Sequence, residues 1–193
     1  MTKLTNPYLL GPLKRSLDLL LSLVLMPVLL PLMGITTLLL LIPTGGKVFY
    51  SQNRVGQGGK VYTMFKFRTL KANADHDTAG MSKTADDFLP FGKWVRRWRL
   101  DEFPQVFNIL AGSMSWIGPR PERPHIFSHQ VESHPELAER LAAKPGITGW
   151  AQVNGFRGDT CLRERIKCDL FYIENWNLFW DFQIMLLTFV KRD

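Results

Sequence analysis

Two adjacent carboxylates, Asp101 and Glu102, stand at the start of a helix predicted over residues 100–112. Asp101 is in position to cap this helix, Pro104 lies in the first turn, where proline is tolerated, and Gly112 is a typical stop signal. Unpaired backbone N–H groups and the helix dipole stabilise negative charge at such an end, so they favour an ionised carboxylate with a phosphate beside it. The alternative is an ordinary acidic cap without catalytic chemistry, which is common in helices.

Basic residues in several motifs are candidates to bind anionic groups near this pair. Arginine offers a planar fork of donors that suits two-point contact with phosphate. On a strand predicted over residues 60–69, two cations point to the same face, which is unfavourable unless an anion lies opposite; a solvated edge is the alternative. Two carboxylates with several such cations predict a diphosphate substrate and a divalent metal. The candidate substrate-binding residues are Lys66, Arg68, Arg96, Arg120 and Arg157.

A leucine-rich segment from Leu17 to Ile42 contains one charged residue, Asp18. It is longer than a signal-peptide core and long enough to cross a bilayer, which takes roughly 20 residues. Pro27 and Pro31 disfavour a straight helix at its centre, and basic residues flank both ends, which by the positive-inside bias places both flanks in the cytoplasm. We therefore expect a kinked re-entrant helix that dips into the membrane and returns. A bitopic helix with a tolerated kink is the alternative.

The chain as a whole predicts a mixed α/β, helix-rich fold in two parts. Residues 1–46 form the membrane-associated re-entrant helix, in which Arg15 and Asp18 lie one turn apart and can pair. Residues 47–193 form a compact cytosolic domain, which would carry the chemistry. A lipid near the membrane segment is then a natural acceptor for a phosphate-bearing group.

Local patterns predict the elements of the cytosolic part. A glycine-rich turn joins two short strands into a β-hairpin, and helices follow it. Aromatic residues around an apolar helix near the C-terminus favour interfacial amphipathic helices; packing in the core is the alternative, and for Trp176 the two are equally favoured. The strands are expected over 47–52 and 60–69, and the further helices over 91–99, 136–143 and 160–174.

Composition narrows the class of partner. A net charge of +7 attracts nucleic acid, anionic lipid or phosphate-rich small molecules. The leucine-rich segment favours the last two, and because the sequence shows none of the usual nucleic-acid modules, we expect no nucleic acid. Cys161 and Cys168, about 10 Å apart on a predicted helix, are too distant for a disulfide. His125 and His129 have the i, i+4 spacing of some zinc sites but lack the His-Glu-x-x-His pattern, so a metal is not expected there.

Taken together, the motifs resemble those of the monotopic phosphoglycosyl transferases, the bacterial sugar transferase family. Their order and spacing along the chain carry the resemblance more than any single motif does. The matching segments are Lys14–Asp18, Gln52–Gly56, Lys66–Thr69, Leu100–Asn108, Gly118–Pro121, Lys144–Gly155 and Asp169–Trp176. The resemblance implies transfer of a sugar-1-phosphate from a UDP-sugar to polyprenyl (undecaprenyl) phosphate, with Mg²⁺, at the cytoplasmic face of the bacterial inner membrane. That reaction is the first membrane step of exopolysaccharide, O-antigen or glycoconjugate synthesis.

The resemblance also implies roles for the candidate residues. Asp101 would be the nucleophile that attacks the sugar-proximal phosphorus, expels UMP and becomes an aspartyl phosphosugar, and it would also contact the metal. Glu102 would be the general base or proton handler for the polyprenyl phosphate. The five cations, Lys66, Arg68, Arg96, Arg120 and Arg157, would hold the diphosphate and the acceptor phosphate.

The sequence departs from the family pattern in the membrane helix. Small members break this helix at a Ser-Pro pair, where Leu30 and Pro31 stand here with Pro27 added. We interpret the chain as a small form or as the catalytic domain of a large form, and the transferred sugar does not follow from the sequence. The expected partners are a UDP-sugar, polyprenyl phosphate and the lipid bilayer, and a homo-oligomer is compatible with the sequence. Two other functions stay open: a non-catalytic membrane-surface scaffold, and a lipid-linked phosphotransferase with a CDP-activated donor.

Overall fold

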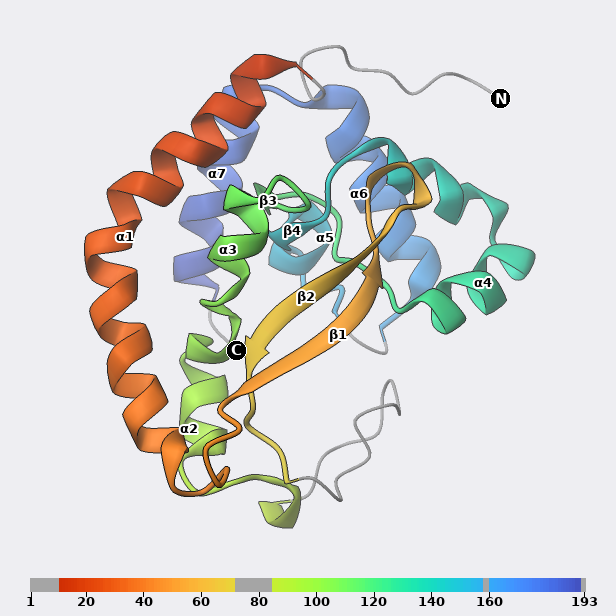
Figure 1. The fold of residues 1–193 in the computed structure, drawn as a ribbon. Coiled ribbons are helices and arrows are strands. Elements are labelled where there is room, and N and C mark those ends of the chain that lie inside the picture. The colour runs from red at the N-terminus through yellow and green to blue at the C-terminus, as the bar shows by residue number, and fades with distance from the viewer. Residues whose placement is uncertain (1–10, 72–84, 158–159, 192–193) are drawn as a thin grey trace.

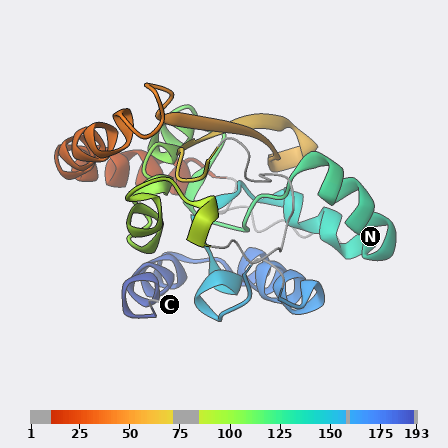
Figure 2. The same cartoon turned by 90° about the horizontal axis from the view of Figure 1, so that it is seen from below.

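The computed structural model describes residues 11–71, 85–157 and 160–191. A β-hairpin lies on one side of the domain and three C-terminal helices lie on the other, with a second small sheet between them (Figure 1, Figure 2). The helix-rich α/β fold is therefore confirmed. The elements are α1 (Pro12–Leu41), β1 (Phe49–Val55), η1 (Gln57–Gly59), β2 (Val61–Phe67), η2 (Ala85–Asp87), α2 (Gly92–Arg97), η3 (Leu100–Glu102), α3 (Gln105–Leu110), β3 (Ser115–Ile117), α4 (Pro124–Ser133), η4 (Pro135–Ala142), β4 (Gly146–Thr148), α5 (Trp150–Val153), α6 (Leu162–Asn175) and α7 (Leu178–Val190).

Helix α1 curves along one side of the domain and is long and apolar enough to cross a membrane, by length and composition (Figure 1). It continues through Pro27 and Pro31, each of which removes a backbone donor and favours a bend. Buried side chains recur at helical spacing, so one face packs on the domain while the other leaves leucine and valine side chains exposed. The buried residues are Lys14, Asp18, Ser22, Leu29, Met33, Thr36 and Leu40.

Polar contacts hold the N-terminal end of α1. The expected pairing of Arg15 with Asp18 is wrong, because both side chains find partners on the domain. Arg15 donates from its guanidinium to the carbonyl oxygens of Ile109 and Leu110, at the end of α3. Asp18 accepts a hydrogen bond from the Ser115 hydroxyl at 2.9 Å. Backbone acceptors and a buried hydroxyl therefore replace the surface ion pair.

The C-terminal end of α1 is held by apolar contacts. Met33 and Leu40 pack with Val48, Phe67 and Val95, which come from the start of the hairpin, the end of β2 and α2. Burial of such side chains stabilises the fold by about 1.5–3 kcal/mol each. Both ends of α1 are thus attached to the same domain. The N-terminal part of the expected 1–46 segment, residues 1–10, lies outside the described residues.

The predicted β-hairpin is confirmed. β1 and β2 pair antiparallel from Phe49 opposite Phe67 to Val55 opposite Val61. A second sheet, of the short parallel strands β3 and β4, was not predicted. In this sheet the backbones approach so closely that a Cβ on Gly146 would lie 2.1 Å from the Gly118 nitrogen, so only glycine fits there.

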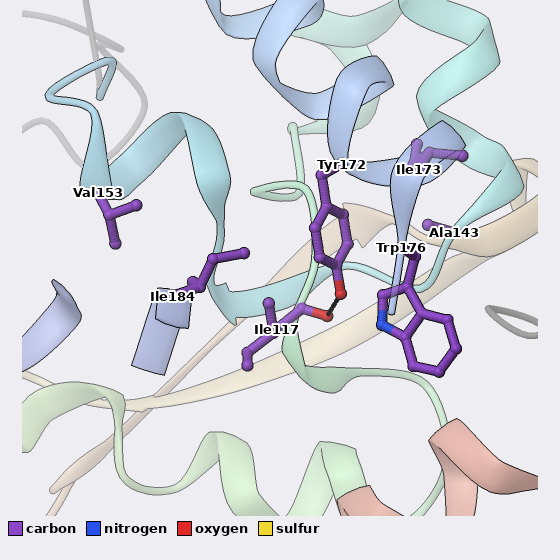
Figure 3. Close-up of a cluster of buried hydrophobic side chains, with 7 residues drawn as sticks. All are labelled: Ile117, Ala143, Val153, Tyr172, Ile173, Trp176 and Ile184. Atoms are coloured by element: carbon purple, nitrogen blue, oxygen red, sulfur yellow. Dashed lines mark hydrogen bonds between the residues drawn. The ribbon is translucent and has the colours of Figure 1, made fainter. Parts of the chain in front are cut away.

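Seven side chains form a core cluster; they come from β3, α5, α6 and its C-cap residue Trp176, α7 and the segment before β4 (Figure 3). Tyr172 donates its hydroxyl to the Ile117 carbonyl at 3.3 Å within this cluster. Trp176 is buried in it, so this tryptophan belongs to the core and not to a membrane surface. Phe179 and Phe189, by contrast, are 71% and 66% exposed.

The helices expected over 91–99 and 160–174 correspond to α2 and α6, whereas α4 was not predicted and the segment 136–143 is the 3-10 helix η4. The single helix expected over 100–112 is wrong. The chain forms the 3-10 turn η3 first, and α3 starts only after Pro104, which is its N-cap. Asp101 therefore lies within η3 and does not cap a helix. Cys161 and Cys168 are free, as expected.

Candidate active site

A strained turn places Asp101 and Glu102 in the interior. Arg99, directly before η3, has a φ of +55°, a left-handed conformation that costs a non-glycine residue about 1–3 kcal/mol and is often found at functional sites. The turn then buries Asp101, which is 5% exposed, and leaves the Glu102 side chain 12% exposed. A buried carboxylate is unfavourable without compensating charge, so the surroundings of the pair decide what it can do.

One amide side chain ties the carboxylate-bearing segment to the hairpin. Asn108, in α3, donates to the Thr63 carbonyl at 2.7 Å and accepts from the Phe65 backbone N–H at 3.1 Å. It therefore satisfies two backbone groups on the open edge of β2. This contact fixes the register between η3–α3 and β2, and Lys66, the residue directly after Phe65, faces Glu102. The Lys66 ammonium donates to Glu102 Oε1 at 2.9 Å.

Arg120 approaches the same carboxylate from the segment after β3. Its Nη2 lies 3.5 Å from Glu102 Oε1. Two other arginines hold the backbone of this segment: Arg54 donates to the Pro121 carbonyl, and Arg140 donates to the Arg120 carbonyl, both at 3.0 Å. Flanking prolines and these two bonds restrict the direction of the Arg120 guanidinium.

The two neighbouring carboxyl groups have opposite pKa shifts. Burial, together with the charge of Glu102, raises the pKa of Asp101 to about 6, although Lys66, Arg96 and Arg120 oppose the rise. Burial alone would also raise the pKa of Glu102, but the charges of Lys66 and Arg120 outweigh it and hold this pKa well below its usual range. At neutral pH, Glu102 is therefore firmly ionised, and Asp101 is an ionised carboxylate that is more basic than usual.

Arg96 contributes to this field from α2. Its guanidinium lies over the Phe88 ring, 5.8 Å from the ring centroid, and its positive charge acts on Asp101. The side chain is exposed, so it is free to meet an incoming anion. Two adjacent carboxylates of different basicity, with three cations around them, have the chemistry that a displacement at phosphorus would need.

Comparison with known proteins agrees with this chemistry. The sequence pattern of the family described as "Bacterial sugar transferase" matches residues 10–192. The chain belongs to the bacterial sugar transferase family. It is 44% identical over 172 residues to the UDP-glucose:undecaprenyl-phosphate glucose-1-phosphate transferase of Xanthomonas campestris pv. campestris, and the match covers 83% of this chain and 36% of that protein.

Two further relatives carry different sugar names. The undecaprenyl-phosphate glucose phosphotransferase of Komagataeibacter xylinus is 37% identical over 189 residues, which cover 93% of this chain and 35% of the relative. The UDP-N-acetylgalactosamine-undecaprenyl-phosphate N-acetylgalactosaminephosphotransferase of Aeromonas hydrophila is 37% identical over 178 residues. These residues cover 91% of this chain and 42% of the relative. This bacterial sugar transferase family member thus spans well under half the length of these relatives.

Within this family member, Lys66, Arg96 and Arg120 act on the pair, whereas the substrate-binding roles of Arg68 and Arg157 stay predictions. Among the described residues, the Arg68 side chain makes no hydrogen bond or ion pair with either carboxylate. The hairpin pairing still reaches this residue, because the Arg68 backbone N–H donates to the Val48 carbonyl at 2.8 Å. Arg157 donates to the Gln152 carbonyl at 2.9 Å, on α5. Lys66, Arg96 and Arg120 form the cationic part of the site.

Two further arginines belong to the site and were missed as candidates. Arg54 lines one small hollow with Lys66, Glu102 and Arg120. Arg99 lowers the pKa of Glu102 by its charge. Arg54 lies in the matching segment 52–56, far from the carboxylates in sequence. Its closeness to them becomes evident only once the register of the hairpin is known.

The carboxylate pair fits magnesium as a partial site. Mg²⁺ takes oxygen ligands and is commonly held by one or two carboxylates together with substrate phosphates. Asp101 offers such oxygens, and the charge of Glu102 that raises its pKa would be balanced by a cation. No group of three or more His, Cys, Asp or Glu side chains occurs within the described ranges, so phosphate oxygens of a substrate would have to complete the coordination.

Proposed function

We propose that this chain is a phosphoglycosyl transferase. It transfers a sugar-1-phosphate from a UDP-sugar to polyprenyl phosphate and releases UMP, through a covalent aspartyl-phosphosugar intermediate on Asp101. The observation that carries the proposal is the division between adjacent carboxylates: Lys66 and Arg120 engage Glu102, while Asp101 keeps a pKa of about 6 in the same cationic field. The names of the relatives support both substrates.

In the first step, a carboxylate oxygen of Asp101 attacks the phosphorus that bears the sugar. The new Asp101–phosphorus bond forms as the bond from this phosphorus to the bridging oxygen breaks, and UMP leaves with that oxygen. An ionised carboxylate with a raised pKa is the better nucleophile, so burial prepares Asp101 for this attack. Arg96 and Arg120 stabilise charge on the transferring phosphoryl group. Mg²⁺ bound with Asp101 and the diphosphate would supply further positive charge there.

In the second step, an oxygen of the polyprenyl phosphate attacks the same phosphorus, and the bond to Asp101 breaks and restores the carboxylate. The acceptor phosphate carries a proton part of the time, since its second pKa is about 6. With its pKa held low, Glu102 is a weak base while Lys66 and Arg120 contact it. We therefore propose that it accepts this proton only when the incoming phosphates draw these two cations away.

We propose that the domain lies at the cytoplasmic face of the bacterial inner membrane, in contact with the bilayer through one side. Figures 1 and 2 both place α1, α2 and α7 on the same side of the molecule. Large apolar side chains are exposed on all three helices: Leu20, Leu23, Val24 and Leu38 on α1, Trp94 on α2, and Phe179, Phe182 and Phe189 on α7. A surface of this size is unusual for a protein that meets only water.

We propose a re-entrant topology for α1, and the attachments of its two ends support it. Lys14 forms an ion pair with Asp181 at one end, and Leu40 packs among the hairpin residues at the other. A bitopic helix would carry one of these ends to the far side of the bilayer and break its contacts. With both ends on the domain, α1 enters and leaves the membrane on one face, which holds the site close to a lipid phosphate.

The reaction is tested with the full chain in lipid nanodiscs. With a UDP-sugar and no acceptor, the wild type should release up to one UMP per chain and gain the mass of one sugar phosphate. Asp101→Asn should do neither, and the control Glu139→Gln, an exposed acid on η4, should behave as wild type. Turnover by Asp101→Asn equal to wild type would remove the covalent mechanism. Donors with glucose, galactose and N-acetylated sugars identify the sugar, and CDP-activated donors test the other nucleotide.

The topology is tested by cysteine labelling in spheroplasts. In a background with Cys161 and Cys168 replaced by serine, Ser16→Cys and Lys47→Cys each provide one exposed thiol near an end of α1. Both thiols should react with a membrane-impermeant reagent only after the membrane is opened. Labelling of either position from the outside would reject the re-entrant topology.

A further inference from the structure

A second cavity, separate from the catalytic carboxylates, opens at the start of α1. Its volume is about 190 Å³, well above the ~10–15 Å³ that a single water molecule needs. Its lining includes Lys14, Arg15, Asp18 and Lys144. It shares no lining residue with the hollow of Lys66 and Glu102. In Figure 1 the start of α1 is at the top, and the α2–α3 connection that holds the carboxylates is in the lower half.

The three cations of this cavity differ in whether a carboxylate neutralises them. Lys14 is neutralised, since its ammonium contacts Asp181 at 2.5 Å and Asp18 at 3.9 Å. Within the part of the chain that the structure describes, Arg15 donates only to neutral backbone carbonyls, so no carboxylate there pairs with its positive charge. Lys144 makes no hydrogen bond or ion pair with any residue in the described part of the chain. Two of the three cations therefore lack an anionic partner.

Arg15 and Lys144 converge on one point of the backbone. A Cβ built on Gly112 would lie 3.6 Å from Arg15 Nη2 and 3.9 Å from Lys144 Nζ. Burial, and then the charge of Arg15, lower the pKa of Lys144, and the charge of Asp18 opposes this only in part. Asp18 is itself engaged by the Ser115 hydroxyl and the Trp116 backbone N–H. The cavity therefore holds two like charges that an anion could bridge.

We propose that this cavity binds a phosphate group between Arg15 and Lys144. A planar guanidinium and an ammonium around one opening are the usual partners of phosphate. The phosphate could belong to an anionic phospholipid headgroup or to free phosphate. The headgroup is placed well, because the cavity adjoins the first turns of α1, which also carry the exposed Leu13 and Leu20. Acyl chains could then lie along these leucines while the headgroup enters the cavity.

The test compares thermal unfolding of the full chain in three conditions: phosphatidylcholine nanodiscs alone, the same with inorganic phosphate, and nanodiscs that contain phosphatidylglycerol. The wild type should gain Tm in one of the two conditions that add phosphate with a net negative charge, because the phosphate of phosphatidylcholine is already balanced by its choline. Lys144→Met should raise the phosphate concentration that gives half of the Tm gain by about tenfold or more, since one charged contact is lost. Lys93→Met removes an exposed lysine on α2 and controls for general attraction to anionic membranes, so it should keep the wild-type response.

The Tm of Lys144→Met without anionic phosphate separates a binding role of Lys144 from a structural one. In phosphatidylcholine alone, Lys144→Met should unfold at the same Tm as wild type or higher, because repulsion from Arg15 is relieved. Lys144→Arg should restore the phosphate response. A gain with inorganic phosphate identifies the free ion as the ligand, and a gain with phosphatidylglycerol alone identifies the lipid. An equal gain in Lys144→Met and wild type, or no gain in the wild type, would overturn the proposal. None of these readouts requires transferase activity.

Discussion

The Lys66 ammonium lies 2.9 Å from Glu102 Oε1, and this contact crosses from the β-hairpin to the turn that carries both carboxylates. It keeps Glu102 ionised and leaves Asp101 as the more basic member of the pair. The division of roles between two adjacent acids thus depends on one residue 36 positions earlier in the chain.

Replacement of Lys66 tests this dependence. Lys66→Met removes a positive charge that lowers the pKa of both Asp101 and Glu102. We expect kcat/KM for UMP release to fall at least about a hundredfold, as for loss of a charged donor in a preorganised site. The acidic limb of the pH–rate profile should also move above pH 6. Lys60→Met, in the exposed turn of the hairpin, is the control. An unchanged profile with a reduced rate would mean that Lys66 only binds substrate.

The raised pKa of Asp101 predicts a gain in stability when this residue loses its charge. The folded-state pKa of about 6 is above the ordinary value of 3.8, so Asp101 favours the folded state below pH 3.8 and this stability is lost as the pH rises through 6. Asp101→Asn should therefore raise the free energy of unfolding at pH 7.5 by up to about 3 kcal/mol. The gain should disappear near pH 4. Denaturant unfolding at both pH values measures it, and a loss of stability at pH 7.5 would contradict the shift.

Glu102 should behave in the opposite way. Its folded-state pKa is below the ordinary value of 4.5, so its contribution to stability is present above pH 4.5 and is lost as the pH falls. Glu102→Gln leaves Lys66 without its partner in a largely buried site and should lower the free energy of unfolding at pH 7 by about 3–5 kcal/mol. The same unfolding experiment on both variants provides a direct contrast. A change of the same sign in the free energy of unfolding for Asp101→Asn and Glu102→Gln would reject the opposite pKa shifts of the two carboxyl groups.

The sequence could assign to the site those residues that their immediate neighbours in the chain mark out. Asp101 and Glu102 stand out as an adjacent pair, and Arg120 stands between two prolines, so their importance is visible without coordinates. The structure brings Glu102, Lys66 and Arg120 together as expected. The roles of Asp101 as nucleophile and of Glu102 as proton handler stay predictions.

The errors arise where tertiary contacts override local pattern. The helix expected from residue 100 fails because the left-handed Arg99 and Pro104 divide the segment into a turn and a shorter helix. The parallel pairing of β3 with β4 joins segments about thirty residues apart, each only three residues long, and such short strands carry no periodicity to detect.

A buried ion network predicts a remote effect on the site. Arg140 contacts Asp169 at 2.7 Å and donates to the Arg120 carbonyl at 3.0 Å. Arg140→Met leaves the Asp169 charge buried without this partner, so the free energy of unfolding should fall by about 3–5 kcal/mol. Because Arg120 is no longer restrained, KM for the UDP-sugar should rise more than kcat falls. Arg163→Met, an exposed arginine on α6, is the control. Full activity in Arg140→Met would show that the flanking prolines and Arg54 direct Arg120 without Arg140.

The exposed phenylalanines of α7 predict a loss of membrane affinity without a loss of stability. Phe179 and Phe182 are 71% and 60% exposed, so they contribute little to the folded domain but would each place a large apolar surface in the bilayer. The double variant Phe179→Gln/Phe182→Gln should bind lipid vesicles at least about tenfold more weakly while its Tm stays within about 2 °C of wild type. The control Phe127→Gln changes a half-buried phenylalanine on α4, on the opposite side of the molecule (Figure 1), and should leave vesicle binding unchanged. Sedimentation with vesicles measures the binding, and unaltered affinity in the double variant would remove α7 from the membrane-contacting side.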